Sequence, residues 1–325
     1  MAKGPQKLKI LYLAKVLLEE TDEEHALMMN EIISRLSDYG IEAERKGLYT
    51  DIEDLRAFGL DIIGEKRGRY FSYYIGSRKF ELPELKLLVD SVLASKFISE
   101  KKSKELVKKL EGLTSREEAK ELNREIVISG RVKTVNEGVL YTVDSIHQAI
   151  ADDRKIKFRY FQWNRKKERE LRHGGAFYTV SPWALLWDDE YYYLVAFDGM
   201  IKHYRVDKIL ELSVTDENRE GRESFEKIDM GSYAKMTFSM FKGEEENVTI
   251  EAENRFAGML IDRFGHDIFI MPVDEDHFRV RVTVAVSEQF ISWVFSLGDG
   301  IRITGPDNVT KRIHETVERL SRQYP

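Results

Sequence analysis

A strongly basic stretch with aromatic side chains lies near the middle of the 325-residue chain. Residues 154–172 hold nine Lys or Arg residues against two Glu residues, a local net charge of +7, with Tyr160, Phe161 and Trp163 among them. Cations attract phosphate groups, and aromatic rings stack on bases with about 1–3 kcal/mol per base. The stretch is therefore suited to a nucleotide or a fragment of nucleic acid.

A second group of basic residues lies near the N-terminus. Leu48, Ile52 and Leu55 recur at helical spacing, which predicts a helix from about 44 to 57 with these residues inward. Arg and Lys suit guanine edges or phosphates, and Thr and Tyr suit phosphates or a thymine methyl. The outward residues near the helix start are Arg45, Lys46, Tyr49 and Thr50. Taken alone, the two cations among them could simply be exposed to solvent without binding anything.

The elements around this helix give it a DNA-binding context. Apolar spacing predicts helices over 6–20 and up to Gly40, and β-prone runs cover 60–63 and 70–75 with a cationic turn at 64–68. Three helices followed by a hairpin is the order of a winged helix-turn-helix, which we place at residues 1–80. The predicted phosphate-binding residues of the wing are Lys66, Arg67 and Arg69.

The segment from Arg45 to Ile52 resembles the start of the recognition helix in DeoR-like regulators, a run such as Arg-Lys-x-Leu-Tyr-x-Asp-Ile. Gly47 departs from that pattern. A glycine inside a helix costs about 1 kcal/mol relative to alanine. We therefore expect a helix that is marginal before DNA binds.

The remaining chain divides by pattern into three further parts. Residues 81–136 are predicted to be a charged helical connector that also packs a dimer. Residues 137–215 are rich in short β-prone runs and indicate a small barrel, and residues 230–325 indicate an α/β sandwich. The predicted fold class is thus multidomain α+β.

The segment from Tyr178 to Ile209 resembles the WYL domain. Tyr192, Tyr193 and Leu194 occupy the positions of the Trp-Tyr-Leu that names the family, with Tyr in place of Trp. His203, Arg205 and Asp207 match its His-x-Arg-x-Asp segment. The resemblance implies a transcription regulator, usually dimeric, with an Sm-like barrel that binds nucleic-acid fragments or nucleotides. The ligand residues it implies are Tyr160, Tyr178, His203 and Arg205.

Each of these residues also has a structural interpretation. The Tyr-Tyr-Leu run lies in a predicted strand, so at least two of its side chains are expected in the core. Arg205 could contact a ligand, where it would clamp phosphate bidentately, or form a buried ion pair with Asp207. For Tyr160 the two roles are equally open.

The sequence offers no catalytic, metal or cofactor site. The chain has no cysteine, which excludes thiolate sites and disulfides. Its seven histidines lack metal-ligand spacing, and Gly-x-Ser-x-Gly and the P-loop are absent. We expect no enzyme. Without a signal-peptide pattern or a long apolar run, we expect a cytoplasmic protein without membrane contact.

The leading hypothesis is a homodimeric repressor that binds a double-stranded DNA operator and responds to a nucleotide or nucleic-acid-like ligand of the WYL domain. An alternative is a single-strand nucleic-acid-binding accessory protein of a defence or DNA-repair system. A third, weaker possibility is a ligand-binding or enzymatic protein without a DNA function. The net charge of −6 argues weakly against nucleic acid, but local charge matters more than the sum.

Overall fold

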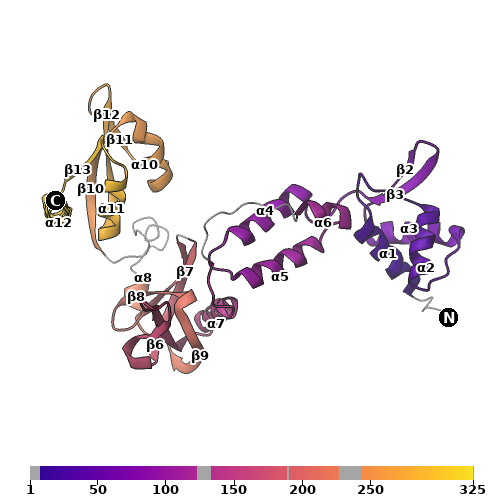
Figure 1. The fold of residues 1–325 in the computed structure, drawn as a ribbon, viewed down its shortest axis with the longest axis horizontal. Coiled ribbons are helices and arrows are strands. Elements are labelled where there is room, and N and C mark those ends of the chain that lie inside the picture. The colour runs from indigo at the N-terminus through magenta and orange to yellow at the C-terminus, as the bar shows by residue number, and fades with distance from the viewer. Residues whose placement is uncertain (1–7, 123–132, 189, 227–242, 325) are drawn as a thin grey trace. The chain divides into compact units, whose positions relative to one another are not determined.

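The computed structural model describes residues 8–122, 133–188, 190–226 and 243–324 (Figure 1). Contacts along the chain divide it into two compact units, residues 1–137 and residues 138–325. Each unit contains two groups of elements. In the described residues no helix is long and apolar enough to cross a membrane.

The first group of elements is a helical cluster with a small sheet. Antiparallel pairing gives the strand order β1-β3-β2. Most of the predicted inward leucines and isoleucines of the three helices are buried, whereas Ile10 and Ile33 are partly buried. Gly59 ends α3 with a left-handed φ of 109°. The elements are α1 (Lys9–Glu20), β1 (Leu27–Met28), α2 (Met29–Asp38), α3 (Arg45–Phe58), β2 (Ile62–Arg67) and β3 (Tyr70–Ile75).

The hairpin corrects one expectation. The predicted turn at 64–68 is mostly strand, because β2 continues to Arg67 and Gly64 pairs with Tyr73. A Cβ at Gly64 would lie 2.8 Å from the Phe71 ring, so glycine here admits an aromatic neighbour rather than a turn. The helices and hairpin follow the expected order, and the winged helix-turn-helix assignment stays a prediction.

The predicted helical connector contains three described helices. They are α4 (Leu82–Ala94), α5 (Glu100–Glu111) and α6 (Arg116–Leu122), and α4 lies beside α5 (Figure 1). Leu85, Val89, Val107 and Leu122 form their shared core. Ser99 caps α5 by accepting a hydrogen bond from the Lys102 N–H. The predicted helical residues 123–128 lie outside the described residues.

The second unit begins with helix α7 (Val139–Ala151) and a curled antiparallel sheet that forms a half-barrel. The path is β5-β4-β6-β7-β8, and β9 pairs with β4. Strand β4 is thus central and pairs with three others. The sequence did not predict β5 or β9. The strands are β4 (Arg154–Trp163), β5 (Arg169–Leu171), β6 (Tyr178–Asp188), β7 (Tyr191–Phe197), β8 (Ile201–Arg205) and β9 (Ile209–Asn218), followed by helix α8 (Arg222–Glu226).

The last part of the chain is an α/β sandwich, as the sequence predicts, with its elements in the order βαββαβα. Its antiparallel sheet has the order β11-β12-β10-β13. Alternate residues of β10 and β12 are buried with Phe290 and Ile291 of α11. The elements are β10 (Glu244–Glu253), α10 (Ala257–Phe264), β11 (Ile270–Pro272), β12 (His277–Val286), α11 (Glu288–Ser296), β13 (Ile301–Gly305) and α12 (Asp307–Gln323).

Phe290→Ala tests this core directly, because the side chain is fully buried (0% exposed). We expect it to lower the free energy of unfolding by about 3–5 kcal/mol, from lost burial and the cavity left behind. Phe269→Ala is the matched control, since Phe269 is 76% exposed, and should change it by less than about 0.5 kcal/mol. Urea denaturation measures both, and equal effects would contradict the core assignment.

Candidate nucleic-acid interface and sensor site

The outward face of α3 begins with cations, as the sequence predicts. The Arg45 Nε donates to Tyr49 Oη at 2.8 Å, and the guanidinium lies 5.9 Å from the Tyr49 ring centroid. Tyr49 is 41% exposed, and Lys46 and Thr50 are also exposed. The four predicted residues therefore share one solvent-facing surface over the first turns of the helix.

The inner side of the same turns explains Gly47. Lys9 of α1 forms an ion pair with Asp51 at 2.6 Å. A Cβ at Gly47 would lie 3.3 Å from the Lys9 Nζ, tighter than most real contacts. The glycine thus lets the Lys9 side chain cross the helix surface and tie α1 to α3.

The second half of α3 is acidic or already paired. Glu53 and Asp54 are exposed. Arg56 donates to Glu53 at 2.6 Å and to the carbonyl of Ile62 at 2.8 Å. An anionic partner is therefore attracted to the start of α3 and repelled further along.

The β2–β3 hairpin, the predicted wing, carries both paired and unpaired cations. Lys66 and Arg69 are exposed and have no ion-pair partner among the described residues. Arg67 is tied to Glu65 at 2.5 Å and to the carbonyl of Glu23 at 2.5 Å, and its guanidinium lies 4.9 Å from the Tyr74 ring centroid. Arg67 anchors the hairpin to the loop after α1 in this structure, while its neighbours face solvent.

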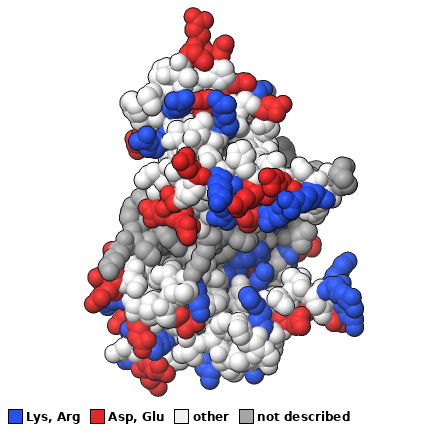
Figure 2. Space-filling view, turned by 90° about the vertical axis from the view of Figure 1, so that its left-hand side faces the viewer, with Lys and Arg blue, Asp and Glu red and all other residues white. Residues whose placement is uncertain are grey.

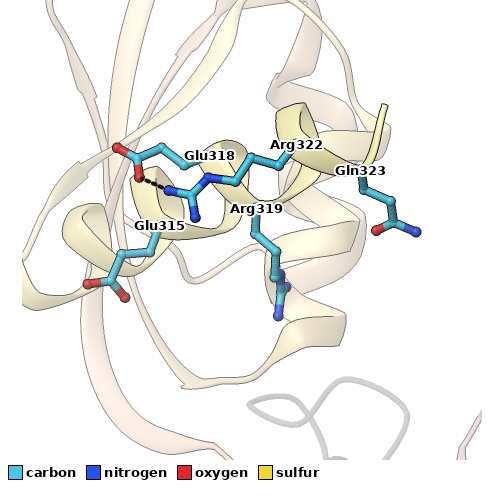
Figure 3. A pocket seen from close by; sticks show the side chains of 5 residues that line it. All are labelled: Glu315, Glu318, Arg319, Arg322 and Gln323. Atoms are coloured by element: carbon cyan, nitrogen blue, oxygen red, sulfur yellow. Dashed lines mark hydrogen bonds and ion pairs between the residues drawn. The ribbon is translucent and has the colours of Figure 1, made fainter. Parts of the chain in front are cut away.

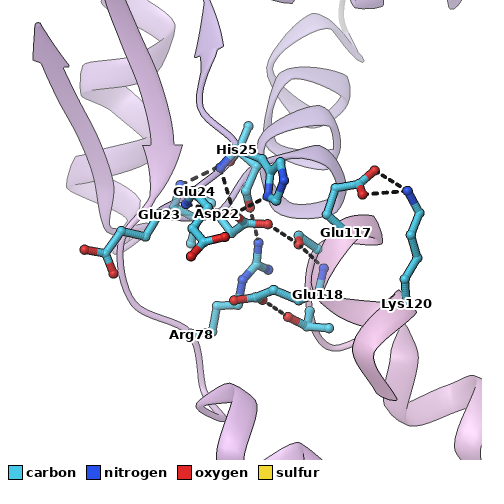
Figure 4. Close-up of polar contacts among 12 residues, drawn as sticks. Asp22, Glu23, Glu24, His25, Arg78, Glu117, Glu118 and Lys120 are labelled. Carbon is cyan, nitrogen blue, oxygen red and sulfur yellow. Dashed lines mark hydrogen bonds and ion pairs between the residues drawn. The ribbon is translucent and has the colours of Figure 1, made fainter. Parts of the chain in front are cut away.

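The same loop joins the α1–β3 part to the connector through a buried carboxylate (Figure 4). Asp22, 4% exposed, accepts from Ser115 Oγ at 2.5 Å and from the His25 ring at 2.8 Å. Burial acts to raise the pKa of Asp22, but hydrogen bonds from Ser115 and His25 outweigh it and hold that pKa below its ordinary value. Arg116 adds ion pairs to Glu19 and Glu20 at the start of α6.

In the second unit, four aromatic rings gather inside the half-barrel. Tyr160 of β4, Tyr178 of β6 and Tyr204 of β8 lie with ring centroids 5.5–6.2 Å apart, and Phe158 stacks on Tyr178 at 5.6 Å. Tyr160 Oη accepts from the Arg205 N–H at 3.1 Å. Burial raises the pKa of Tyr160 to about 12, so its hydroxyl keeps its proton at neutral pH. The structure thus brings together three of the four predicted ligand residues, Tyr160, Tyr178 and Arg205.

Arg205 forms the ion pair that the sequence left open. Its guanidinium donates to Asp207 from Nε at 3.1 Å and from Nη2 at 2.9 Å, and it lies 3.6 Å from the Tyr191 ring centroid. Burial acts to lower the pKa of Arg205, but the Asp207 hydrogen bonds and charge raise it above its ordinary value. A bidentate grip on a ligand phosphate would compete with Asp207 for the same donors.

Two further cations lie within electrostatic range of this pair. Burial, then the positive charge of Arg205, lowers the pKa of Lys208, and Arg172 acts in the same direction. Arg172 is exposed. Three cations, Arg172, Arg205 and Lys208, thus act in this region against Asp207, while Asp198 acts on the neighbouring Tyr204. The cations outnumber the carboxylates, which favours an anion.

A buried hydroxyl inside the half-barrel has no partner among the described residues, and of the three cations Arg172 acts on it electrostatically. Tyr204 is 6% exposed, and its Oη makes no hydrogen bond among the described residues. Burial raises the pKa of Tyr204, so this oxygen stays protonated and can donate. Buried hydroxyls are normally satisfied, which makes this one a candidate contact for a ligand or water.

The two histidines nearest this cluster are placed differently. His203 precedes Tyr204 on β8, so strand alternation puts it on the opposite strand face, the same one as Arg205. His173 meets the Tyr178 ring edge-on at 5.2 Å. The sequence did not single out His173, Arg172, Tyr204 or Lys208 as ligand residues. Tyr204 and Lys208 lie inside the motif that carried the resemblance, and Arg172 ends the basic stretch.

Family models match both parts of the second unit. Residues 141–214, which hold the half-barrel strands and the tyrosine–arginine cluster, match the model of the WYL domain. The chain contains a WYL domain. Residues 244–321 match the WCX domain, so the C-terminal sandwich has a family description as well. The DeoR-like assignment of the N-terminal segment stays a prediction.

Two solved structures are similar at low identity. Proteasome accessory factor B/C (PafBC) of Arthrobacter aurescens is 17% identical, with 99% of this chain and 49% of that chain covered and a TM-score of 0.28. A CRISPR Cas-related protein is 14% identical, with 67% and 62% covered and a TM-score of 0.25. This chain spans about half the length of the PafBC chain. At these TM-scores neither likeness bears on function. No curated protein matches the chain.

Two hollows of the WCX domain are lined by arginines that already have carboxylate partners, so they are weaker candidates for an anion site than the WYL cluster. An open hollow of about 540 Å³ lies beside α12, where Arg322 pairs with Glu318 at 3.5 Å (Figure 3). A second hollow, of about 310 Å³, is lined by Glu251 and Arg302, which pair with each other at 2.5 Å. Figure 2 likewise shows basic side chains interspersed with acidic ones on the face drawn. In the two hollows, the charges of Arg322 and Arg302 are therefore largely neutralised by Glu318 and Glu251.

Tyr204→Phe and Tyr160→Phe form a matched pair of tests for the WYL cluster. Tyr204→Phe removes a buried hydroxyl without a partner, so we expect unchanged or higher stability in ligand-free protein. Tyr160→Phe leaves the Arg205 N–H without its acceptor and should cost about 1–3 kcal/mol. Urea denaturation compares them, and a larger loss for Tyr204→Phe would show that its hydroxyl is satisfied.

Proposed function

We propose that the protein is a DNA-binding transcription regulator, a homodimeric repressor whose WYL domain senses a nucleotide-like anion. The observation that carries the proposal is the exposed cationic surface at the start of α3, with Arg45 and Lys46 beside Tyr49 and Thr50. On this proposal the protein binds DNA and a ligand and catalyses no reaction.

In the DNA-binding step, α3 enters the major groove with its first turns. Arg45 and Lys46 contact guanine edges or phosphates there, and Lys66 and Arg69 contact the backbone from the wing. The acidic second half of α3, with Glu53 and Asp54, points away from the phosphates. This polarity supports an insertion led by the N-terminal end of the helix.

In the sensing step, the anion is held by the cation cluster of the WYL domain. Arg172 and Lys208 supply charge, and Tyr204 Oη supplies a hydrogen bond. Arg205 keeps its ion pair with Asp207. It therefore attracts the anion through its positive charge and does not hold a phosphate with two hydrogen bonds. His203 and Tyr178 stay ligand candidates from the family resemblance.

Signal transfer requires that the ligand stabilise one arrangement of the dimer over another. Within the first unit, Asp22 and Ser115 fix the DNA-binding part to α6, so movement of the connector carries that part with it. A shift of the half-site spacing by a few ångström is enough to prevent both α3 helices from binding adjacent turns of DNA.

Selection of genomic fragments by the purified full chain, followed by sequencing, tests the DNA-binding proposal. We expect a palindrome whose half-sites lie one or two helical turns apart. Arg45→Ala/Lys46→Ala should weaken binding to that duplex by about 10-fold or more, because each lost base-edge contact costs about 1–3 kcal/mol.

The control is Lys108→Ala/Lys109→Ala, which removes the same charge from an exposed face of α5. It should leave the affinity for the selected duplex within about twofold of wild type at moderate salt. Enrichment of no duplex, or an equal loss in both variants, would reject the assignment of α3.

Thermal unfolding with a panel of nucleoside mono- and diphosphates tests the sensor. A ligand at 100 times its Kd stabilises the folded state by about 2.7 kcal/mol, a shift of several degrees in Tm. Arg172→Ala/Lys208→Ala should abolish the shift while preserving binding to the selected duplex. A full shift in this variant would show that these cations do not hold the anion.

A further inference from the structure

A four-residue turn that begins with Asp and ends with His occurs twice in the chain, at 22–25 and at 274–277. In the first turn, Asp22 Oδ1 accepts from the backbone N–H groups two and three residues on, at 3.0 and 2.8 Å, and from the His25 ring at 2.8 Å. In the second, Asp274 Oδ1 accepts from the corresponding N–H groups, both at 2.8 Å, and from the His277 ring at 2.9 Å. The two turns share these local hydrogen bonds, so a difference in their behaviour comes from their surroundings.

The first turn is joined to a helix that lies far from it in the sequence. The Asp22 side chain is 5% exposed, and its second oxygen, Oδ2, accepts from Ser115 Oγ at 2.5 Å. Ser115 Oγ in turn accepts from the backbone N–H of Glu118 at 3.1 Å and so caps the start of α6. The Asp274 side chain is 56% exposed, and within the part of the chain that the structure describes it bonds to its own turn alone. Of the two carboxylates, Asp22 is therefore the one that connects its turn to another element.

His25 connects this buried carboxylate to solvent. Its side chain is 49% exposed, so it can exchange protons with water. The hydrogen bond to Asp22 raises the pKa of His25, burial opposes that shift, and the charges of Asp22, Glu117 and Glu24 add to it. Protonation of His25 therefore places a cation directly against a buried anion.

The other charged groups around this pair leave His25 as the group that responds near neutral pH. Arg78, which follows β3, interacts with the charges of Asp22 and Glu118, and Lys120 pairs with Glu117 at 2.5 Å (Figure 4). Histidine is the side chain whose ordinary pKa lies in the neutral range, so a pH change around 7 acts on this contact through His25. The remaining charged neighbours are Glu23 of the loop, Arg67 of β2, and Arg116 of α6 with its partners Glu19 and Glu20 of α1.

We propose that the contact of Asp22 with His25 and Ser115 is a pH-responsive joint between the loop after α1 and helix α6. With His25 protonated, a neighbouring cation compensates the buried charge of Asp22, and the carboxylate holds Ser115. After His25 has lost its proton, its ring still donates a hydrogen bond, but burying the Asp22 charge against α6 costs more. The joint then opens more often.

The direction of the pH dependence follows from both partners. Because the pKa of His25 is raised, its contribution is complete below the ordinary value of 6.5 and is lost as the pH rises through the raised value. Because the pKa of Asp22 is lowered, its contribution is complete above the ordinary value of 3.8 and is lost as the pH falls through the lowered value. The joint is therefore tightest in weakly acidic solution and loosens as the pH rises above 6.5.

Hydrogen exchange of the Glu118 amide in the full chain, measured by NMR without DNA, tests this joint. That N–H donates to Ser115 Oγ, so its protection factor, corrected for the intrinsic exchange rate at each pH, reports how often the contact opens. We expect the protection factor to fall by about two- to fivefold between about pH 5.5 and about pH 8, the range that a partly exposed ion pair supplies. DNA is not needed, so the result does not depend on the proposed function. In the proposed regulator, the joint determines how firmly α3 follows the connector.

His25→Gln keeps a hydrogen-bond donor but takes up no proton, so its protection factor should not change with pH. The matched control is His277→Gln, which makes the same change in the second turn and should keep the pH dependence of wild type. An NMR titration of the histidine rings should also show the pKa of His25 moving back toward 6.5 in Asp22→Asn. A protection factor that is constant with pH in wild type, an unchanged dependence in His25→Gln, or its loss in His277→Gln would overturn the inference.

Discussion

Ion pairing decides which cations of this protein can bind a partner. The chain has 51 Lys and Arg residues against 57 Asp and Glu residues. In the described residues many cations pair with a carboxylate, such as Lys9 with Asp51 and Arg205 with Asp207. A paired surface cation gains little from a new anion, because it must give up its own. Among the described residues, exposed cations without an ion pair gather at the start of α3, at the β2–β3 hairpin and at the β4–β5 hairpin.

The paired cations hold the elements that present the free ones. Lys9 ties α1 to α3 through Asp51, and Arg67 ties the hairpin to the loop after α1. Arg205 is held between Asp207 and the Tyr191 ring. Asp51, the partner of Lys9, is on the same helix as the exposed Lys46. Arg67 lies in sequence between the exposed Lys66 and Arg69. Charge alone does not distinguish the two kinds, because only the folded geometry brings the carboxylate within reach.

The sequence predicted the elements whose apolar pattern is strong. Helices α1 to α3 and the C-terminal order follow from residues repeated at helical or alternating spacing, and the structure confirms those elements. Strand β9 was missed because only Ile209 of its ten residues is buried, so it shows no alternation. The cluster of Tyr160 with Tyr204 depends on pairing between strands far apart in the chain. The motif resemblance predicted part of that cluster, and Arg172 could not be placed without the fold.

The WYL cluster is arranged so that much of the cost of binding an anion is met during folding. Partial burial already lowers the pKa of Lys208, and Tyr204 Oη is buried without a protein partner among the described residues. An anion that accepts from these groups recovers hydrogen bonds and charge stabilisation that the ligand-free protein lacks. Because Asp207 and Tyr191 hold Arg205 in place, little side-chain entropy is lost on binding. These groups therefore favour the binding of an anion, and the proposed sensing further requires that the bound anion favour one arrangement of the dimer over another.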